Sequence, residues 1–214
     1  MPLARRQKRP VVEALTPNST IAARLREADM YFEGKAQVQK SLRRLVKHLK
    51  KARIPYVIAG GLALTAHRYE RLTKDVDVLL STEGFAAFRQ QFVNKHYDPV
   101  PGRLRRFIDR VNGVPIDVLV SGLFPGFSKT GPFPFPLPGE VAEEIEKISY
   151  VDLPTLVELK LAARRWKDFA DVVELIRYNG LDESFREKLH KSVRGDFIEC
   201  LEEKRREDLY EDNG

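Results

Sequence analysis

The chain has 214 residues, 43% of them hydrophobic and 32% charged, with a formal net charge of +6, which is typical of a globular protein that buries its own apolar core. No apolar run approaches the roughly 18 residues of a membrane-spanning helix, and the basic start of the sequence is not followed by the apolar stretch and cleavage site of a secretory signal. The single cysteine, Cys200, excludes an internal disulfide and a metal site built from cysteines, so we expect a cytoplasmic protein with no membrane partner.

Residues 1–35 are expected to form a basic arm followed by a short helix from Thr20 to Phe32. A second helix is predicted for residues 36–52, where apolar residues recur at helical spacing and basic residues occupy the other face. Between Glu33 and Glu70 the sequence has nine lysines or arginines and no acidic residue. Such a stretch attracts polyanions such as nucleic acid, although a solvated helix face explains it equally well.

Short strands and helices alternate in the next part of the chain. Strands are predicted at residues 56–59 and 75–80, with a helix over 62–67 between them. Ser81 is a suitable N-cap for a helix that reaches Asn94. Two β-rich runs, 104–111 and 114–121, are separated by Asn112-Gly113, which predicts a hairpin.

The segment 122–139 contains five prolines and four phenylalanines, so it is expected to form a loop or an extended flap. One more strand is predicted at 145–151, and helices follow to the end, interrupted at Asn179-Gly180. The order predicts an α+β fold: a core over 36–151, made of a mixed sheet with flanking helices, and a helical C-terminal lobe over 152–214. The cleft between the two is the expected ligand site.

Two aspartates, Asp75 and Asp77, lie two residues apart in the apolar strand K-D-V-D-V-L-L. Because side chains alternate along a strand, the two carboxylates should share a face, with Cα atoms roughly 6.5–7 Å apart. Carboxylates this close repel one another unless a cation lies between them, and Mg²⁺ or Mn²⁺ is the usual solution. The pair alone also fits an exposed strand edge with two solvated acids.

A third aspartate, Asp117, is the only charged residue of the second apolar strand, P-I-D-V-L-V. Its neighbours Ile116 and Val118 should face the core, which places Asp117 on the opposite face. Three acids from two adjacent strands can hold two metal ions about 3.5–4 Å apart for in-line phosphoryl displacement. Asp117 would bind the second metal and could accept the proton of the attacking hydroxyl. The catalytic and metal-binding candidates are therefore Asp75, Asp77 and Asp117.

Gly60 and Gly61 lie between a predicted strand and a predicted helix, upstream of the aspartates. Two glycines let the backbone approach a phosphate closely, and the start of a helix presents unpaired N–H groups. Taken alone, the pair also fits an ordinary turn from strand to helix.

The order of these motifs resembles that of the DNA polymerase β superfamily of nucleotidyltransferases. Within it, I-A-G-G-L-A-L and R-L-T-K-D-V-D-V-L-L look most like the AbiEii-type enzymes, which are the toxin halves of some bacterial toxin–antitoxin pairs. The resemblance covers about residues 54–178 and implies a polymerase β-like core that moves a nucleoside monophosphate from an NTP to an acceptor hydroxyl. It also implies tRNA as an acceptor, a cognate antitoxin partner and a nucleotide-binding role for Thr73. Leu62 departs from the family pattern, because many members have Ser or Thr directly after the glycines.

The C-terminal motif L-V-E-L-K-L-A-A-R-R-W-K-D-F-A-D resembles the family's helical motif, in which a lysine and a later aspartate complete the nucleotide site. These residues correspond to Lys160 and to Asp168 or Asp171. The spacing of Lys160, Arg164 and Lys167 places them on one helix face, where they could grip the β- and γ-phosphates. A solvated basic face is the alternative, and Asp171 could pair with Lys167.

Three functions are compatible with this sequence. The first is nucleotidyl transfer to RNA, for which the arginines of the hairpin could guide the acceptor, although an exposed sheet face explains them as well: Arg103, Arg105, Arg106 and Arg110. The second is nucleotidyl transfer to a small-molecule or protein hydroxyl. The third is a non-catalytic nucleotide-binding protein of the same fold, which the presence of all three aspartates disfavours.

Overall fold

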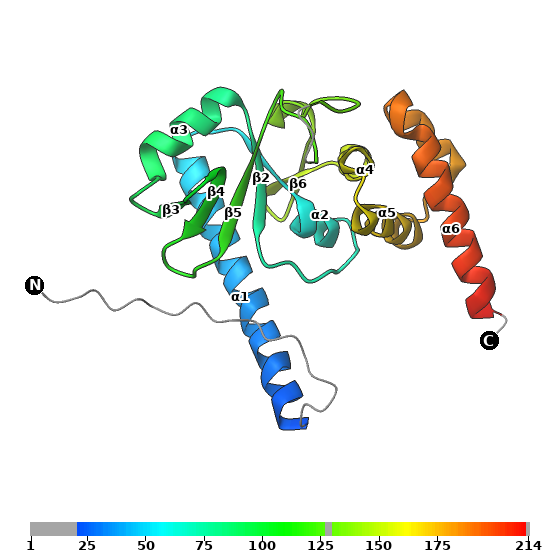
Figure 1. Ribbon diagram of the computed structural model, residues 1–214. Coiled ribbons are helices and arrows are strands. Elements are labelled where there is room, and N and C mark those ends of the chain that lie inside the picture. The colour runs from blue at the N-terminus through cyan, green and yellow to red at the C-terminus, as the bar shows by residue number, and fades with distance from the viewer. Residues whose placement is uncertain (1–20, 127–129, 213–214) are drawn as a thin grey trace, which may run out of the picture. The chain divides into compact units, whose positions relative to one another are not determined.

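The computed structural model describes residues 21–126 and 130–212, so the predicted arm over 1–20 lies outside the described residues (Figure 1). The chain divides into two compact units, Met1–Gly34 and Lys35–Gly214. A single helix, α1 (Ile21–Lys51), replaces the two helices predicted for this region. That prediction was wrong because Gly34, although it weakens a helix by about 1 kcal/mol relative to alanine, does not end one.

The second unit is built on a seven-stranded mixed sheet. Inside the sheet, β1 (Tyr56–Ala59) pairs antiparallel with β2 (Val76–Leu80), which is the central strand, and parallel with β7 (Ile148–Val151). Strand β5 (Pro115–Val120) runs parallel to β2 on its other side. The outer strands are β3 (Tyr97–Val100), β4 (Arg103–Asp109) and β6 (Ala142–Ile145). The sheet order β3-β4-β5-β2-β1-β7-β6 and the helices around it make this an α+β fold, as the sequence predicted.

In the part of the chain that the structure describes, five further helices follow α1: α2 (Gly60–Ala66), α3 (Thr82–Phe92), α4 (Leu153–Ala163), α5 (Trp166–Asn179) and α6 (Arg194–Asp212). Short 3₁₀ turns are present at Pro138–Glu140, Glu183–Lys188 and Lys191–Val193. The predicted end signals are confirmed, since Ser81 Oγ accepts a hydrogen bond from the Gly84 amide and Gly180 caps α5 in the left-handed conformation. None of the described helices is both long and apolar enough to cross a membrane.

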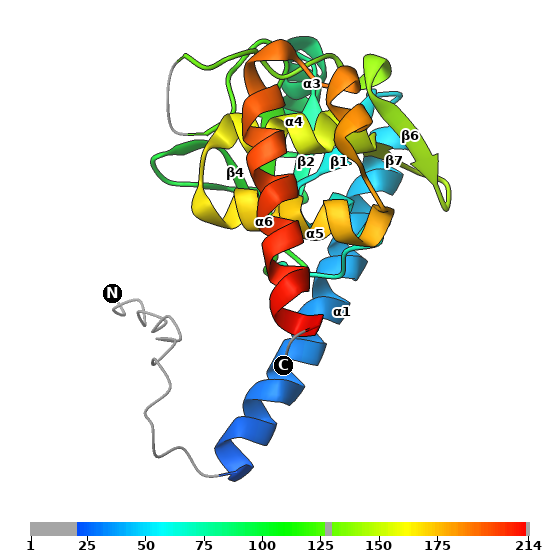
Figure 2. The ribbon, with the colours of Figure 1, turned by 90° about the vertical axis from the view of Figure 1, so that its right-hand side faces the viewer.

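The two faces of the sheet carry two different cores. Val76, Val78 and Leu80 of β2 point to one side, where they pack with the buried stripe of α1 and with α3. Val57 and Leu79 point to the other side and pack with the apolar residues of α4 and α5. Figure 1 shows α3 on one side of the sheet and α2, α4 and α5 on the other, and α6 covers α5 from outside (Figure 2). Asp77, which alternates with Val76 and Val78, therefore faces the layer that contains α4.

Two edge strands of the sheet differ from the sequence prediction. Strand β3 was not predicted, and the single strand predicted at 145–151 is the β6–β7 hairpin, which turns at Glu146 and Lys147 with φ values of 50° and 65°. Both β3 and β6 lie at an edge of the sheet, where polar residues and a proline such as Pro99 are tolerated and no apolar alternation develops.

Candidate active site

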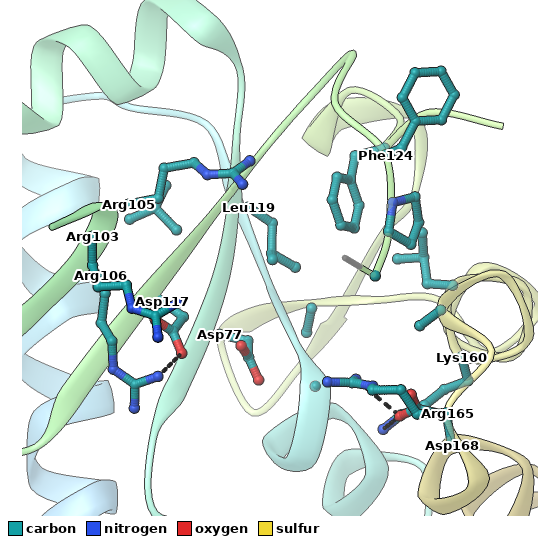
Figure 3. Close-up of a pocket in the computed structure, with 18 of the residues that line it drawn as sticks. Asp77, Arg103, Arg105, Arg106, Asp117, Leu119, Phe124, Lys160, Arg165 and Asp168 are labelled. Atoms are coloured by element: carbon teal, nitrogen blue, oxygen red, sulfur yellow. Dashed lines mark hydrogen bonds and ion pairs between the residues drawn. The ribbon is translucent and has the colours of Figure 1, made fainter. Parts of the chain in front are cut away.

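A pocket of about 520 Å³ opens on the sheet face that carries α4 (Figure 3). Its floor is formed by the ends of β1, β2 and β5, and its walls come from β4, from the segment after β5, and from the turn between α4 and α5. The volume lies in the range of small-molecule and cofactor sites. Eight charged residues line it: Asp77, Asp117, Asp168, Arg103, Arg105, Arg106, Lys160 and Arg165.

Asp77 occupies the middle of the pocket floor. On the sheet it lies between Ala59 of β1 and Asp117 of β5, which are its Cα partners on either side. Burial and, after it, the nearby charges of Asp75 and Asp117 together raise the pKa of its carboxyl to about 7. Near neutral pH the carboxyl is therefore partly protonated at the position where the sequence predicted a metal ligand.

Gly60 seats the Asp77 carboxylate. The residue has φ +61°, and a Cβ atom built on it would lie 1.8 Å from Asp77 Oδ2. The left-handed backbone and the lack of space both require glycine here. The sequence suggested that the glycines let a phosphate approach, whereas in the structure Gly60 makes room for a carboxylate of the protein itself.

Asp75 is oriented by the turn that precedes β2. The strand begins at Val76, so Asp75 lies just outside it rather than in regular alternation with Asp77. Thr73 Oγ1 donates a hydrogen bond to Asp75 Oδ1 at 2.9 Å. Thr73 also packs against Gly61, where an added Cβ would lie 2.7 Å from Thr73 Cβ. The predicted residues Gly61, Thr73 and Asp75 thus form one contact group beside the described lining of the pocket.

Asp117 shares the sheet face of Asp77, as the alternation predicted. Ile116, Val118 and Val120 are buried on the opposite face. Arg106, the cross-strand partner of Asp117, places Nη1 3.1 Å from Asp117 Oδ2. Burial nevertheless keeps the pKa of the Asp117 carboxyl above its ordinary value, against the opposing effect of Arg106.

The donor set fits a hard divalent cation, because Mg²⁺ and Mn²⁺ prefer carboxylate oxygens and the charge of Asp75 raises the pKa of both Asp77 and Asp117. As the side chains lie, no group of three or more His, Cys, Asp or Glu residues in the described chain is arranged to hold a metal ion. Asp75 accepts a hydrogen bond from Thr73, and Asp117 pairs with Arg106.

Lys160 is the centre of a buried ionic cluster. Its side chain is 7% exposed, and Nζ lies 3.1 Å from Asp168 Oδ1 and 2.6 Å from Asp171 Oδ2. Arg165 pairs with Asp168, and Arg71 donates to both oxygens of Asp171 at 3.1 Å. Buried charges are tolerated when they are paired in this way. The sequence left open whether Asp168 or Asp171 accompanies Lys160, and the structure shows that both do.

The predicted row of Lys160, Arg164 and Lys167 on one helix face was wrong. Helix α4 ends at Ala163, and Arg164 caps it in the left-handed conformation with φ 52°. Arg164 then turns to Asp196 at 2.9 Å, and Lys167 lies exposed on the next helix. The pairing suggested between Asp171 and Lys167 is replaced by the one with Lys160. The sequence A-A-R-R-W-K contains no glycine or proline at this break. Its spacing therefore predicts one continuous helix where the structure has two.

Two parts of the pocket were not predicted as site residues. Arg165, which precedes α5, lines the pocket where Arg164 was expected. The Pro/Phe-rich segment contributes Phe124, Pro125, Gly126 and Phe135. Of the hairpin arginines, three line the pocket, while Arg110 pairs with Asp98 instead.

No protein-family model matches the chain, and no curated protein matches it in sequence. Similar solved structures include a protein from H. pylori described as a candidate nucleotidyltransferase, with a TM-score of 0.44 and 14% identity over 85% of this chain and 82% of that one. JHP933 from Helicobacter pylori gives a TM-score of 0.42 and 13% identity over 72% and 71% of the two chains. The Megavirus polyadenylate synthase gives 0.38 and 18% identity over 84% of this chain, which spans only 41% of that enzyme. At these scores the similarity identifies neither a family nor an activity.

Proposed function

We propose that this protein is a metal-dependent nucleotidyltransferase of the polymerase β type, which moves a nucleoside monophosphate from an NTP to an acceptor hydroxyl and releases pyrophosphate. The observation that carries the proposal is the pairing of Asp77 and Asp117 on adjacent parallel strands, both with raised carboxyl pKa values, on the floor of a pocket lined by five cationic side chains. Acidic groups with raised pKa values in a pocket are typical of functional sites.

Asp75, Asp77 and Asp117 are the residues that would hold Mg²⁺ or Mn²⁺. Bound there, the metal would neutralise the triphosphate and lower the pKa of the attacking hydroxyl. Asp77 must release its proton to become a ligand. Metal binding at Asp117 would compete with its ion pair to Arg106.

The protein's own groups supply the remaining chemistry. Asp117, whose carboxyl already has a raised pKa, is the residue suited to accept the proton of the attacking hydroxyl. The positive charges of Lys160 and Arg165 lower the pKa of Asp77. Both side chains therefore contribute to the electrostatic potential at the pocket floor. Lys160 is fixed between two aspartates, whereas the Arg165 side chain is 42% exposed and is the one suited to contact a phosphate directly.

For the acceptor we propose RNA, with tRNA as the first species to examine. Support comes from the AbiEii-like wording of the motifs and from three arginines of β4 at the pocket: Arg103, Arg105 and Arg106. Arginine is well suited to bind the phosphates of a polynucleotide. On the same basis we propose a role as the cytoplasmic toxin of a toxin–antitoxin pair, with an antitoxin protein as partner.

The proposal is tested by incubating the protein and Mg²⁺ with each α-labelled NTP and, in separate reactions, with tRNA, other RNA, proteins and small-molecule hydroxyl compounds. Label in tRNA is the expected result, and label in a protein or a small molecule would replace the acceptor while keeping the reaction. Asp77→Asn and Asp117→Asn should abolish transfer. Asp98→Asn is the control, because Asp98 lies on β3 and pairs with Arg110 outside the pocket. Undiminished transfer by Asp77→Asn, or no binding of Mg²⁺–NTP by the wild type, would refute the proposal.

A further inference from the structure

The lining of the pocket has a charged part and an apolar part. Three aspartates and five cationic side chains make up the charged part, and the apolar part is formed by Leu119, Phe124, Pro125, Phe135, Leu156 and Leu159. Figure 3 shows Phe124 on one side of the pocket and the three arginines of β4 on the other. A ligand that fills such a pocket has an anionic end and a flat or apolar end. A nucleotide meets that description.

The chain that carries Phe124 is fixed by hydrogen bonds at its base. The Gly122 amide donates to the Phe135 carbonyl at 2.9 Å, and the Phe135 amide donates back to the Leu123 carbonyl at 2.7 Å. Ser121 Oγ donates to the Pro136 carbonyl at 2.7 Å. These hydrogen bonds join the two ends of the Pro/Phe-rich segment. Phe124 directly follows the residues that they hold in place.

The same stretch is also packed against the helix layer. Gly126 has φ +83°, and a Cβ atom built on it would lie 3.2 Å from the Ala163 carbonyl oxygen at the end of α4. The glycine thus lets this backbone approach the end of the helix closely. Lys160 precedes Ala163 in the sequence and Arg165 follows it. The end of α4 therefore contacts the Pro/Phe-rich segment and also lies next to the cationic side chains.

The Phe124 ring is positioned but not buried. It packs on one side against Gly131, where an added Cβ would lie 3.2 Å from Phe124 Cδ1. The side chain still remains partly exposed where it lines the pocket. Phe135, by contrast, is 8% exposed and belongs to the core. Phe124 therefore lines the pocket with a side chain that the core does not enclose.

We propose that Phe124 is the surface on which the base of the bound NTP stacks, and that residues 122–126 form the base-binding wall of the pocket. This inference rests on the proposed function and names how the same site holds its substrate. Stacking on an aromatic ring favours any base, because every base has a π face. The six apolar side chains named above have no hydrogen-bonding groups, so we expect the wall to discriminate weakly among the four bases.

The test compares Phe124→Ala, Phe124→Tyr and the control Leu123→Ala, because Leu123 is adjacent, 43% exposed and outside the described lining. Calorimetry measures the affinity of each variant for the four Mg²⁺–NTPs and for Mg²⁺–tripolyphosphate, which has no base. Phe124→Ala should weaken every NTP by about 5- to 150-fold, the range expected for loss of one base–aromatic stack. Tripolyphosphate binding should not change, Phe124→Tyr should restore NTP affinity, and Leu123→Ala should resemble the wild type.

A fluorescent analogue gives an independent readout. The emission of 2-aminopurine riboside triphosphate falls when its base stacks, so quenching is expected with the wild type and Phe124→Tyr but not with Phe124→Ala. Wild-type NTP affinity in Phe124→Ala would overturn this inference and leave the proposed function standing. An equal loss of tripolyphosphate binding would also overturn it, since the effect would then not involve the base. A wild type that binds neither NTP nor tripolyphosphate would overturn the proposed function first.

Discussion

Replacing Gly60 with alanine tests whether the central carboxylate of the pocket depends on the absence of a side chain at the end of β1. The matched control is Gly180→Ala. Gly60 has φ +61° and Gly180 has φ +60°, so alanine adopts the same left-handed backbone at both positions. That conformation costs about 1–2 kcal/mol for a residue with a Cβ atom. The two sites differ in their surroundings, because no described atom lies within 4 Å of a Cβ on Gly180, whereas Asp77 Oδ2 lies 1.8 Å from one on Gly60.

The excess effect at Gly60 follows from that overlap. Forcing an added methyl group into a packed site costs about 1–3 kcal/mol beyond the backbone strain. In a chain of this size about 1 kcal/mol lowers Tm by roughly 2–4 °C. We therefore expect Gly60→Ala to melt about 2–12 °C below Gly180→Ala, a range obtained by combining the two estimates. Gly60→Ala should also lose transfer, because Asp77 is displaced, while Gly180→Ala should keep it.

Thermal and urea unfolding without added metal measure both costs, and Asp77→Ala in each background completes a double-mutant cycle. Removal of the carboxylate should recover most of the extra destabilisation of Gly60→Ala and none of the destabilisation of Gly180→Ala. The coupling energy should therefore be about 1 kcal/mol or more between residues 60 and 77, and close to zero between residues 180 and 77. Equal costs for the two glycine variants, with no coupling to Asp77, would refute the seating of Asp77 on Gly60.

Two further predictions concern charge. Because the pKa of Asp77 rises from 3.8 to about 7 on folding, the native state holds the extra proton between these values, and the free energy of unfolding without metal should fall as pH rises from about 4 to 7. Asp77→Asn should remove this pH dependence and stabilise the protein at pH 8 by up to about 4 kcal/mol, or by less where solvent screens the carboxyl group. Urea unfolding at pH 5 and pH 8 measures the difference. A variant with the same pH dependence as the wild type would contradict the prediction. Lys160→Met should destabilise by about 3–5 kcal/mol, because Asp168 and Asp171 lose their shared cation in a buried setting. The exposed Lys167→Met is the control, and similar urea midpoints for the two variants would contradict the expectation.

The part of the site that could be predicted from sequence is the part fixed by local alternation. In β2 and β5 every second residue is apolar and buried, so Asp77 and Asp117 had to share the other face once the strands paired. The error at Arg164 has the opposite cause. The end of α4 is set by a left-handed residue that is not glycine, and nothing local distinguishes Arg164 from the helical residues before it.

The role of Phe124 was equally inaccessible. The segment 122–139 has no periodicity, and its described residues are held by hydrogen bonds between its two ends and by contact with α4. Sequence spacing carries no record of such contacts. The pairing of Arg106 with Asp117 could be read only from the register of β4 against β5, which the Asn112-Gly113 turn suggests but does not determine.

The buried cluster around Lys160 limits how this protein can diverge. Arg71, Lys160 and Arg165 meet Asp168 and Asp171 in one set of contacts, and the loss of any single member removes an ion-pair partner from at least one buried charge. These positions lie up to 100 residues apart in the sequence, since Arg71 precedes β2 and Asp171 belongs to α5. We therefore expect relatives of this chain to keep the five residues as a set or to replace them together. A chimera that exchanges α4 and α5 between diverged relatives should fold only when residue 71 is exchanged with them.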